Sequence, residues 1–237
     1  MAEHIAEQYD EYFAKNRLFE FDEQVLARHF TRPGLVVDLG CGTGRALVAL
    51  ARRGFRGLGV DLSPAMLRIV AEKARAENLP ISVLRANLVQ LDCLAGGSFD
   101  YAVSLFSTLG MIRGRGHRRQ ALGHVRRALK PGGLFVLHVH NFWFNLFDPV
   151  GRRWLLGHLL SVPFRRGEQR GDKFFHYRGI PEMFLHTFTL GELRGELAAA
   201  GFRIKELIPL AMGRQRPLSC PWLFGRFRAN GWIMVCE

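Results

Sequence analysis

Residues 36–45 read Val36-Val37-Asp38-Leu39-Gly40-Cys41-Gly42-Thr43-Gly44-Arg45, an apolar run that leads into an acidic residue and three glycines at alternate positions. The run from residue 35 to residue 39 predicts a buried parallel strand, because strands buried on both faces are continuously apolar. Residues 46–53 favour the helix that follows. Glycines tolerate a tight turn and let main-chain N–H groups approach a ligand closely. The stretch therefore predicts a strand, a ligand-binding turn and a helix.

The spacing and charge of this turn indicate which ligand suits it. Dinucleotide-binding enzymes use the related spacing G-x-G-x-x-G, in which a helix N-terminus holds a pyrophosphate. Here the spacing is G-x-G-x-G, and the carboxylate of Asp38 would repel a pyrophosphate. S-adenosylmethionine has no phosphate and carries an ammonium and a sulfonium group. We therefore predict that it binds at Asp38, Gly40, Cys41, Gly42 and Gly44.

A second strand is predicted over residues 56–62, and it ends in Asp61 and Leu62. Asp61 follows the glycines by about 20 residues, where a carboxylate can accept hydrogen bonds from ribose hydroxyls. Ser63 and Pro64 then fit a helix N-cap and a first helical residue. We predict that Asp61 and Leu62 both belong to the cofactor site.

In this order the motifs resemble those of class I (Rossmann-like) S-adenosylmethionine-dependent methyltransferases over residues 34–141. The resemblance implies that Asn87 and Leu88, at the end of a third strand, face adenine. Many relatives carry Asp in place of Asn87, and either side chain offers an acceptor oxygen to the adenine amino group. Residues 98–106 resemble the fourth strand, and Phe106 at its end is implied as a further cofactor contact.

The turn Lys130-Pro131-Gly132-Gly133 resembles a signature of the same family, in which proline stops a helix and glycine supplies the left-handed backbone before a fifth strand. The resemblance implies an α/β fold with a doubly wound, seven-stranded, mostly parallel sheet and an antiparallel last strand. We expect a single domain over residues 1–237. Its predicted parts are an N-terminal helical cap (1–33), a cofactor-binding core (34–141), a lid or substrate insertion (142–188), and a C-terminal helix and strands (189–237).

The basic composition raises the question of whether the protein binds an anionic partner. The formal net charge is +12 and the pI is near 10.4, mostly because of arginine. A solvated basic face is one explanation, and binding of RNA or another anionic partner is the alternative. The four cysteines have neither C-x-x-C nor His-Cys spacing, so we expect free thiols and no metal site. The sequence shows no signal-type start and no apolar run of membrane length, so we expect a soluble cytoplasmic protein without stable membrane insertion.

Several residues are candidates for contact with the acceptor. His138 and His140 are two apart in a predicted strand, so their side chains share one face. His140 is a candidate general base or hydrogen-bond partner, because histidine titrates near neutrality. The alternative is that both are core histidines beneath a helix. Further candidates are Asn141, Ser107 and Trp143 as substrate contacts, and Tyr9, which resembles a tyrosine that relatives place beside the methyl-transfer site but could equally be a packed core aromatic.

Three functions stay open from sequence. The first is methyl transfer to a small molecule, which the aromatic insertion favours, with a lipid or quinone precursor as a variant. The second is RNA methylation, because Ser107-Thr108, Arg118-Arg119 and the turn at residues 129–133 are distantly similar to tRNA wobble-uridine methyltransferases. The third is an inactive scaffold that binds the cofactor. The acceptor, the pathway and the oligomeric state stay open.

Overall fold

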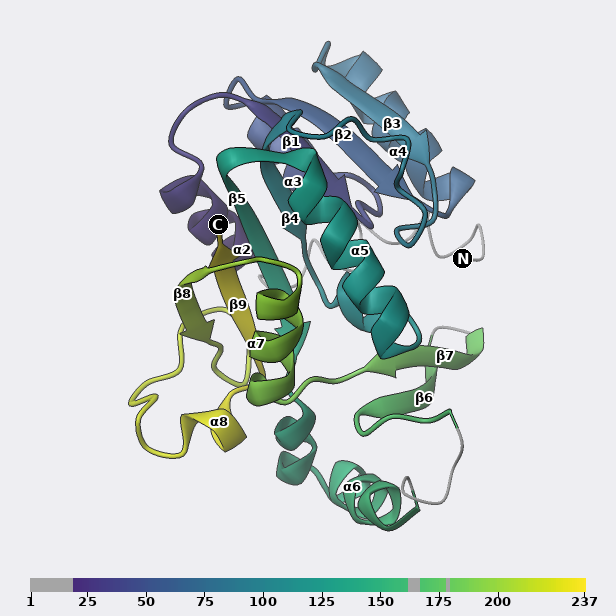
Figure 1. The fold of residues 1–237 in the computed structure, drawn as a ribbon, viewed down its shortest axis with the longest axis vertical. Coiled ribbons are helices and arrows are strands. Elements are labelled where there is room, and N and C mark those ends of the chain that lie inside the picture. Colours follow the sequence, from purple (N-terminus) through teal and green to yellow (C-terminus); the bar gives the residue numbers. More distant parts are fainter. Residues whose placement is uncertain (1–18, 162–166, 178–179) are drawn as a thin grey trace.

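In a computed structural model, residues 19–161, 167–177 and 180–237 can be described. These residues form a seven-stranded sheet with helices on both faces (Figure 1). The strand order is β3-β2-β1-β4-β5-β9-β8, and neighbouring strands are parallel except where β9 pairs with β5 and β8. The prediction of a mostly parallel sheet with an antiparallel last strand is confirmed. The strands are β1 (Leu35–Leu39), β2 (Arg56–Asp61), β3 (Ile81–Arg85), β4 (Phe99–Ser104), β5 (Leu129–His140), β8 (Ile204–Pro209) and β9 (Gly231–Cys236).

The position of the candidate site follows from this strand order. The chain winds outward in both directions from β1 and β4, which are neighbours in the sheet. Open α/β sheets bind ligands beyond the carboxyl ends of the strands at such a reversal of direction. The glycine turn follows β1 at this point, and residues 105–108 follow β4.

Two hydrophobic cores lie on opposite faces of the sheet. Successive residues of β9 alternate between them, with Trp232 and Met234 in one core and Ile233 and Val235 in the other, because side chains along a strand point to opposite faces. One core is covered by α2 (Glu20–His29), α3 (Arg45–Ala51) and α4 (Pro64–Ala76), and the other by α5 (Arg115–Ala128) and α7 (Leu190–Ala199).

The predicted helix boundaries agree with the local chemistry. The Ser63 hydroxyl accepts a hydrogen bond from the Met66 amide, so Ser63 caps α4 and Pro64 is its first residue. Helix α5 ends at Ala128, and Gly132 adopts a left-handed φ of +75°; the Lys-Pro-Gly-Gly sequence itself lies within the first part of β5, where the pairing with β4 shifts in register. The helix end and the left-handed glycine were both predicted from the sequence.

The segment between β5 and α7 extends beyond the carboxyl ends of the central strands (Figure 1). It packs against η2 (Thr108–Met111), where a Cβ added at Gly110 would lie 2.5 Å from the His186 carbonyl oxygen. The segment contains η3 (Phe142–Phe147), α6 (Pro149–Ser161) and a separate antiparallel pair of strands, β6 (Asp172–Tyr177) and β7 (Ile180–His186). A further short helix, α8 (Gly225–Arg228), precedes β9.

A buried network of charged side chains joins this segment to the core. Arg118 of α5 is fully buried and donates hydrogen bonds to Glu196 of α7, at 3.2 and 3.3 Å. Glu192 lies 3.1 Å from His186, and the other ring nitrogen of His186 lies 2.7 Å from Asp172. These contacts fix β6 and β7 to the helices α5 and α7.

None of the described helices combines the length and the apolar character that a membrane crossing requires.

Candidate functional site

The glycine turn after β1 is held against the end of β2. The amides of Gly40 and Cys41 both donate to the Val60 carbonyl, at 2.7 and 3.0 Å. Gly40, Gly42 and Gly44 have left-handed φ angles of +74°, +52° and +76°, which glycine adopts without steric cost. The loop after β4 passes close to Gly40, and a Cβ at that position would overlap the Thr108 side chain. Glycine is therefore required there for space as well as for its backbone angle.

Gly42 is open to a ligand. Among the residues that the structure describes, no atom would lie within 4 Å of a Cβ added here. Beside it lies Asp61, whose Oδ2 accepts a hydrogen bond from the Gly42 amide at 3.0 Å and whose Oδ1 accepts one from the Ser63 amide at 2.9 Å. Each carboxylate oxygen keeps a lone pair for a further donor. Leu62, the next residue, is 61% exposed, which is unusual for a large apolar side chain.

Asp38 lies beneath the turn and is buried. Burial and, to a smaller extent, the charge of Asp61 together raise the pKa of this carboxyl group to about 7. A cation placed beside Asp38 would favour its ionised form. Cys41 is also buried, and burial raises the pKa of its thiol, so it stays a neutral thiol near physiological pH.

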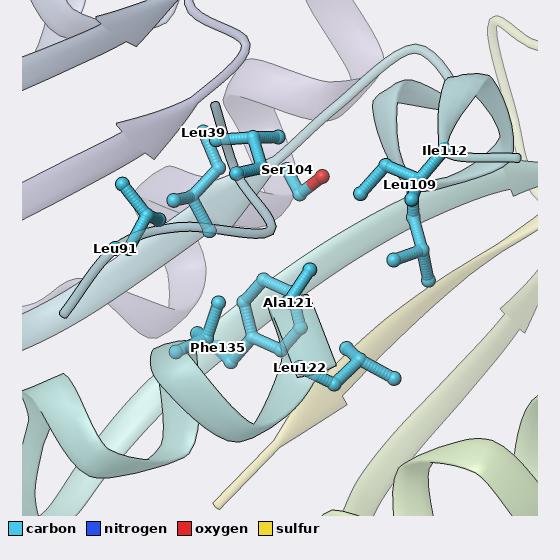
Figure 2. A pocket seen from close by; sticks show the side chains of 10 residues that line it. Leu39, Leu91, Ser104, Leu109, Ile112, Ala121, Leu122 and Phe135 are labelled. Atoms are coloured by element: carbon cyan, nitrogen blue, oxygen red, sulfur yellow. The ribbon is translucent and has the colours of Figure 1, made fainter. Parts of the chain in front are cut away.

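Asn87 and Leu88 follow β3, as predicted. The Asn87 side-chain oxygen accepts a hydrogen bond from the Val89 amide at 3.1 Å, and the side chain is exposed. Leu88 is partly buried and packs against the core. It also lines a small apolar cavity together with residues of β1, β4, β5 and α5 (Figure 2). The cavity holds about 10 Å³, which is space for about one water molecule, so it belongs to the core.

The loop after β4 contains two successive residues, Phe106 and Ser107, in a backbone conformation that non-glycine residues seldom adopt. Phe106 has φ +55° and Ser107 has φ +65°. Such conformations cost about 1–3 kcal/mol each and persist where the surroundings enforce them, often at functional sites. Here the Ser107 amide donates to the His138 carbonyl at 2.8 Å, and the Ser107 hydroxyl accepts from the His140 amide at 3.3 Å. The Phe106 ring stacks on Phe19, with centroids 4.9 Å apart.

His138 and His140 lie on the same face of β5, with ring centroids 6.1 Å apart. His138 is fully buried under α2, and its Nδ1 lies 3.0 Å from Oδ2 of the buried Asp22. The rings of both histidines meet the edge or face of Phe106, with centroids 6.2 and 6.3 Å from it. Within the described residues, three buried polar atoms of this cluster have no hydrogen-bond partner: Asp22 Oδ1, His138 Nε2 and His140 Nδ1.

His140 has a partner that the sequence did not suggest. Nη1 of Arg214 lies 2.7 Å from His140 Nε2, and because a guanidinium only donates, Nε2 must be the acceptor. Burial, the charge of Arg214 and the neighbouring His138 all hold the pKa of His140 well below its usual range. His140 is therefore a neutral imidazole, and the lone pair of its Nε2 accepts the hydrogen bond from Arg214. A general-base role for it would require Arg214 to move away.

Asn141, Trp143 and Tyr9 are the remaining residues predicted to lie beside the acceptor. The Asn141 amide group donates to the Arg226 and Ala229 carbonyls at 2.9 and 2.7 Å, and its oxygen accepts from the Trp143 amide. These bonds give Asn141 a structural role, and its contact with substrate stays a prediction. Trp143 is partly buried against Phe142 and Phe227. Tyr9 lies outside the described residues.

Two residues of this site were missed by the sequence analysis. Asp22 lies three and four residues before Val25 and Leu26, which puts an acidic residue on the apolar stripe of a predicted helix. That position was a usable signal for a buried partner. Arg214 lies in a connecting loop between β8 and α8, more than 70 residues from His140, and no periodicity or motif links the two.

The two neighbouring arginines that suggested RNA binding differ in their exposure to solvent. Arg118 is buried against Glu196 and is unavailable to phosphate groups, whereas Arg119 is exposed.

Comparisons with known proteins agree with this architecture. A family model described as a methyltransferase domain matches residues 36–133. A putative methyltransferase from Geobacillus sp. (strain WCH70) is 32% identical over 129 residues, which cover 54% of this chain and 49% of that protein. The chain spans about half the length of the first curated relatives that it matches.

Solved structures share the fold over nearly the whole chain. A S-adenosylmethionine-dependent methyltransferase from Methanosarcina mazei has a TM-score of 0.72 at 20% identity, covering 90% of this chain and 95% of that chain. The 1,6-didemethyltoxoflavin-N1-methyltransferase of Burkholderia thailandensis, with bound 1,6-didemethyltoxoflavin and S-adenosylhomocysteine, has a TM-score of 0.65 at 17% identity, covering 98% of this chain and 83% of that chain.

Proposed function

We propose that this chain, which belongs to the class I S-adenosylmethionine-dependent methyltransferase family, transfers the methyl group of that cofactor to a small-molecule acceptor. The observation that carries the proposal is the open glycine turn beside Asp61. No described residue would crowd a Cβ at Gly42, and the Gly42 amide donates to the Asp61 carboxylate at 3.0 Å.

The residues of the turn fit the chemistry of S-adenosylmethionine. The carboxylate of Asp61 has lone pairs for ribose hydroxyls, and the exposed Leu62 offers an apolar surface for the adenine ring. The buried Asp38, with its raised pKa, lies where a cation would offset its desolvation. A pyrophosphate ligand would meet the repulsion of both carboxylates.

Methyl transfer from S-adenosylmethionine requires no covalent bond between the protein and the reactants. The bound cofactor supplies a methyl group already activated by positive charge, so the protein contributes through positioning and exclusion of water. Asp38, Asp61 and the glycine turn would hold the cofactor. Phe106 and Ser107, held in strained conformations after β4, would form the boundary between cofactor and acceptor.

Two observations support a small acceptor. The segment between β5 and α7 is tied to the core by the buried Arg118 network and lies beyond the carboxyl ends of the strands, where it would enclose a small molecule. The 1,6-didemethyltoxoflavin-N1-methyltransferase, which has the same fold, has the small molecule 1,6-didemethyltoxoflavin bound.

RNA methylation is the second candidate, because the formal net charge of +12 favours anionic partners. A labelling experiment separates the two. The protein is incubated with methyl-labelled S-adenosylmethionine and either a small-molecule extract or total tRNA. We expect label in the small-molecule fraction. Label in nuclease-sensitive material instead would support the RNA candidate and contradict the small-acceptor proposal.

A further inference from the structure

Arg214 reaches the end of β5 from the loop between β8 and α8. Its Nη1 donates to His140 Nε2 at 2.7 Å, and its Cζ lies 4.9 Å from the centroid of the Phe106 ring. The guanidinium is therefore held in place by a hydrogen bond on one side and by a cation–π contact with Phe106. Both partners belong to the loop and strand end where we place the acceptor.

The loop that carries Arg214 is closed at its base and anchored. The Ala211 amide donates to the Arg216 carbonyl at 3.0 Å, and the Asn230 side chain donates to the Met212 carbonyl at 3.0 Å. Arg214 itself has a left-handed φ of +57° at the tip. A strained backbone in a closed loop indicates that the direction of this side chain is fixed by the fold.

Arg214 lacks a counter-charge in the part of the chain that can be described. No described carboxylate lies within ion-pair distance of its guanidinium. The charge of Asp22 acts on Arg214 from beyond ion-pair distance, and Oδ2 of that carboxylate is bound to His138 while its Oδ1 has no partner among the described residues. His140 is neutral. Arg214 is partly buried, and its desolvation lowers the pKa of the guanidinium. A half-buried cation without a counter-charge is destabilising unless an anion binds to it.

The free edge of the guanidinium defines which anion fits. Nη1 is bound to His140, and within the described part of the chain Nε and Nη2 remain as two parallel donors, the arrangement that matches the two oxygens of a carboxylate. Resting on the proposed methyltransferase function, we propose that the acceptor is a small carboxylic acid whose carboxylate is bound by Arg214. His140 is then a positioning residue, because it orients the guanidinium toward the acceptor.

The test uses simple probes, since it needs a carboxylate and not the natural acceptor. Benzoate, benzamide and phenyl phosphate are titrated into the protein saturated with S-adenosylhomocysteine, and binding is followed by calorimetry and by the arginine Nε–H signals in NMR. We expect benzoate to bind at least about tenfold more tightly than benzamide, and to shift one arginine signal that is missing in Arg214→Gln.

Variants then assign the effect to Arg214. Arg214→Gln should lose at least about tenfold in benzoate affinity and should no longer distinguish benzoate from benzamide, and Arg214→Lys, which keeps the charge but not the fork, should be intermediate. Arg216→Gln, a change at an exposed arginine of the same loop, should behave as wild type.

Four outcomes would overturn the proposal: no benzoate binding at millimolar concentration, equal binding of benzoate and benzamide, an unchanged benzoate affinity in Arg214→Gln, or tighter binding of phenyl phosphate than of benzoate. S-adenosylhomocysteine is titrated separately into each variant. If S-adenosylhomocysteine does not bind to the wild type, the proposed function is wrong. If it binds but benzoate does not, only the proposed role of Arg214 is wrong.

Discussion

The carboxyl groups of Asp38 and Asp61 are electrostatically coupled beneath the glycine turn. Burial raises the pKa of Asp38 to about 7, and the charge of Asp61 contributes to this rise. Because Asp38 lies at the end of β1 and Asp61 at the end of β2, the parallel pairing of these strands brings the two groups to one edge of the sheet. This edge therefore prefers a cationic ligand.

The affinity for S-adenosylmethionine should rise between pH 5 and pH 7. A cationic ligand binds better when Asp38 is ionised, and below its raised pKa each pH unit should weaken binding by up to about tenfold. Calorimetric titrations at several pH values measure this slope. In Asp38→Asn the slope should be much smaller. Equal affinity of the wild type at pH 5 and pH 7 would contradict the role of Asp38.

The ligand-free protein should show the opposite trend in stability. An acid whose pKa is raised in the folded state binds extra protons there, so the free energy of unfolding falls as pH rises from the unfolded pKa near 3.8 toward 7. Asp38→Asn removes this contribution, so the difference in stability between variant and wild type should grow across that range. Denaturant unfolding at pH 5 and pH 7 measures it.

Replacing His140 should slow methyl transfer without affecting the cofactor. His140→Ala removes the acceptor that holds Arg214, and we expect about a tenfold or greater loss of turnover with unchanged S-adenosylmethionine affinity. His140→Gln can still offer an oxygen to Arg214 and should recover part of the activity. Because the pKa of His140 is held well below its usual range, its protonation should give no inflection in the rate between pH 6 and pH 8. Full activity in His140→Ala would show that the residue has only a packing role.

Arg118→Met should destabilise the fold strongly. The change removes the buried partner of Glu196 and leaves only the half-exposed Arg115, 3.6 Å away, to offset its charge, so we expect a loss toward the lower end of about 3–5 kcal/mol. Arg119→Met, at the exposed neighbouring position, should change the free energy of unfolding by less than about 0.5 kcal/mol. Urea unfolding of the two variants compares them. Similar stabilities would mean that the buried network does not hold β6 and β7 to the core.

The arrangement of the residues that we assign to the cofactor could largely be predicted from sequence, because they follow the ends of successive strands. A glycine turn after β1 and an acidic residue after β2 must meet when those strands are parallel neighbours. The fold was predictable for the same reason, since apolar runs and helix caps such as Ser63 are local signals.

The surroundings of the proposed acceptor site could not be predicted from local sequence patterns. Arg214 meets His140 only because β8 and β9 return to the sheet beside β5 and leave a connecting loop above the end of that strand. The burial of Arg118 likewise depends on how α7 packs on α5, which no local pattern in the sequence states.

The central claim is that the turn at Gly42 and the Asp61 carboxylate bind S-adenosylmethionine, and titration of that cofactor into wild type and Asp61→Ala tests it most directly. The variant loses a charged acceptor for the ribose and the anchor of the Gly42 amide, so we expect its affinity to fall by about 100-fold or more while the fold is retained. Glu77→Ala, which removes an exposed partner of Arg52, serves as the matched control and should bind as wild type does. Unchanged affinity in a folded Asp61→Ala protein would contradict the assignment of this site.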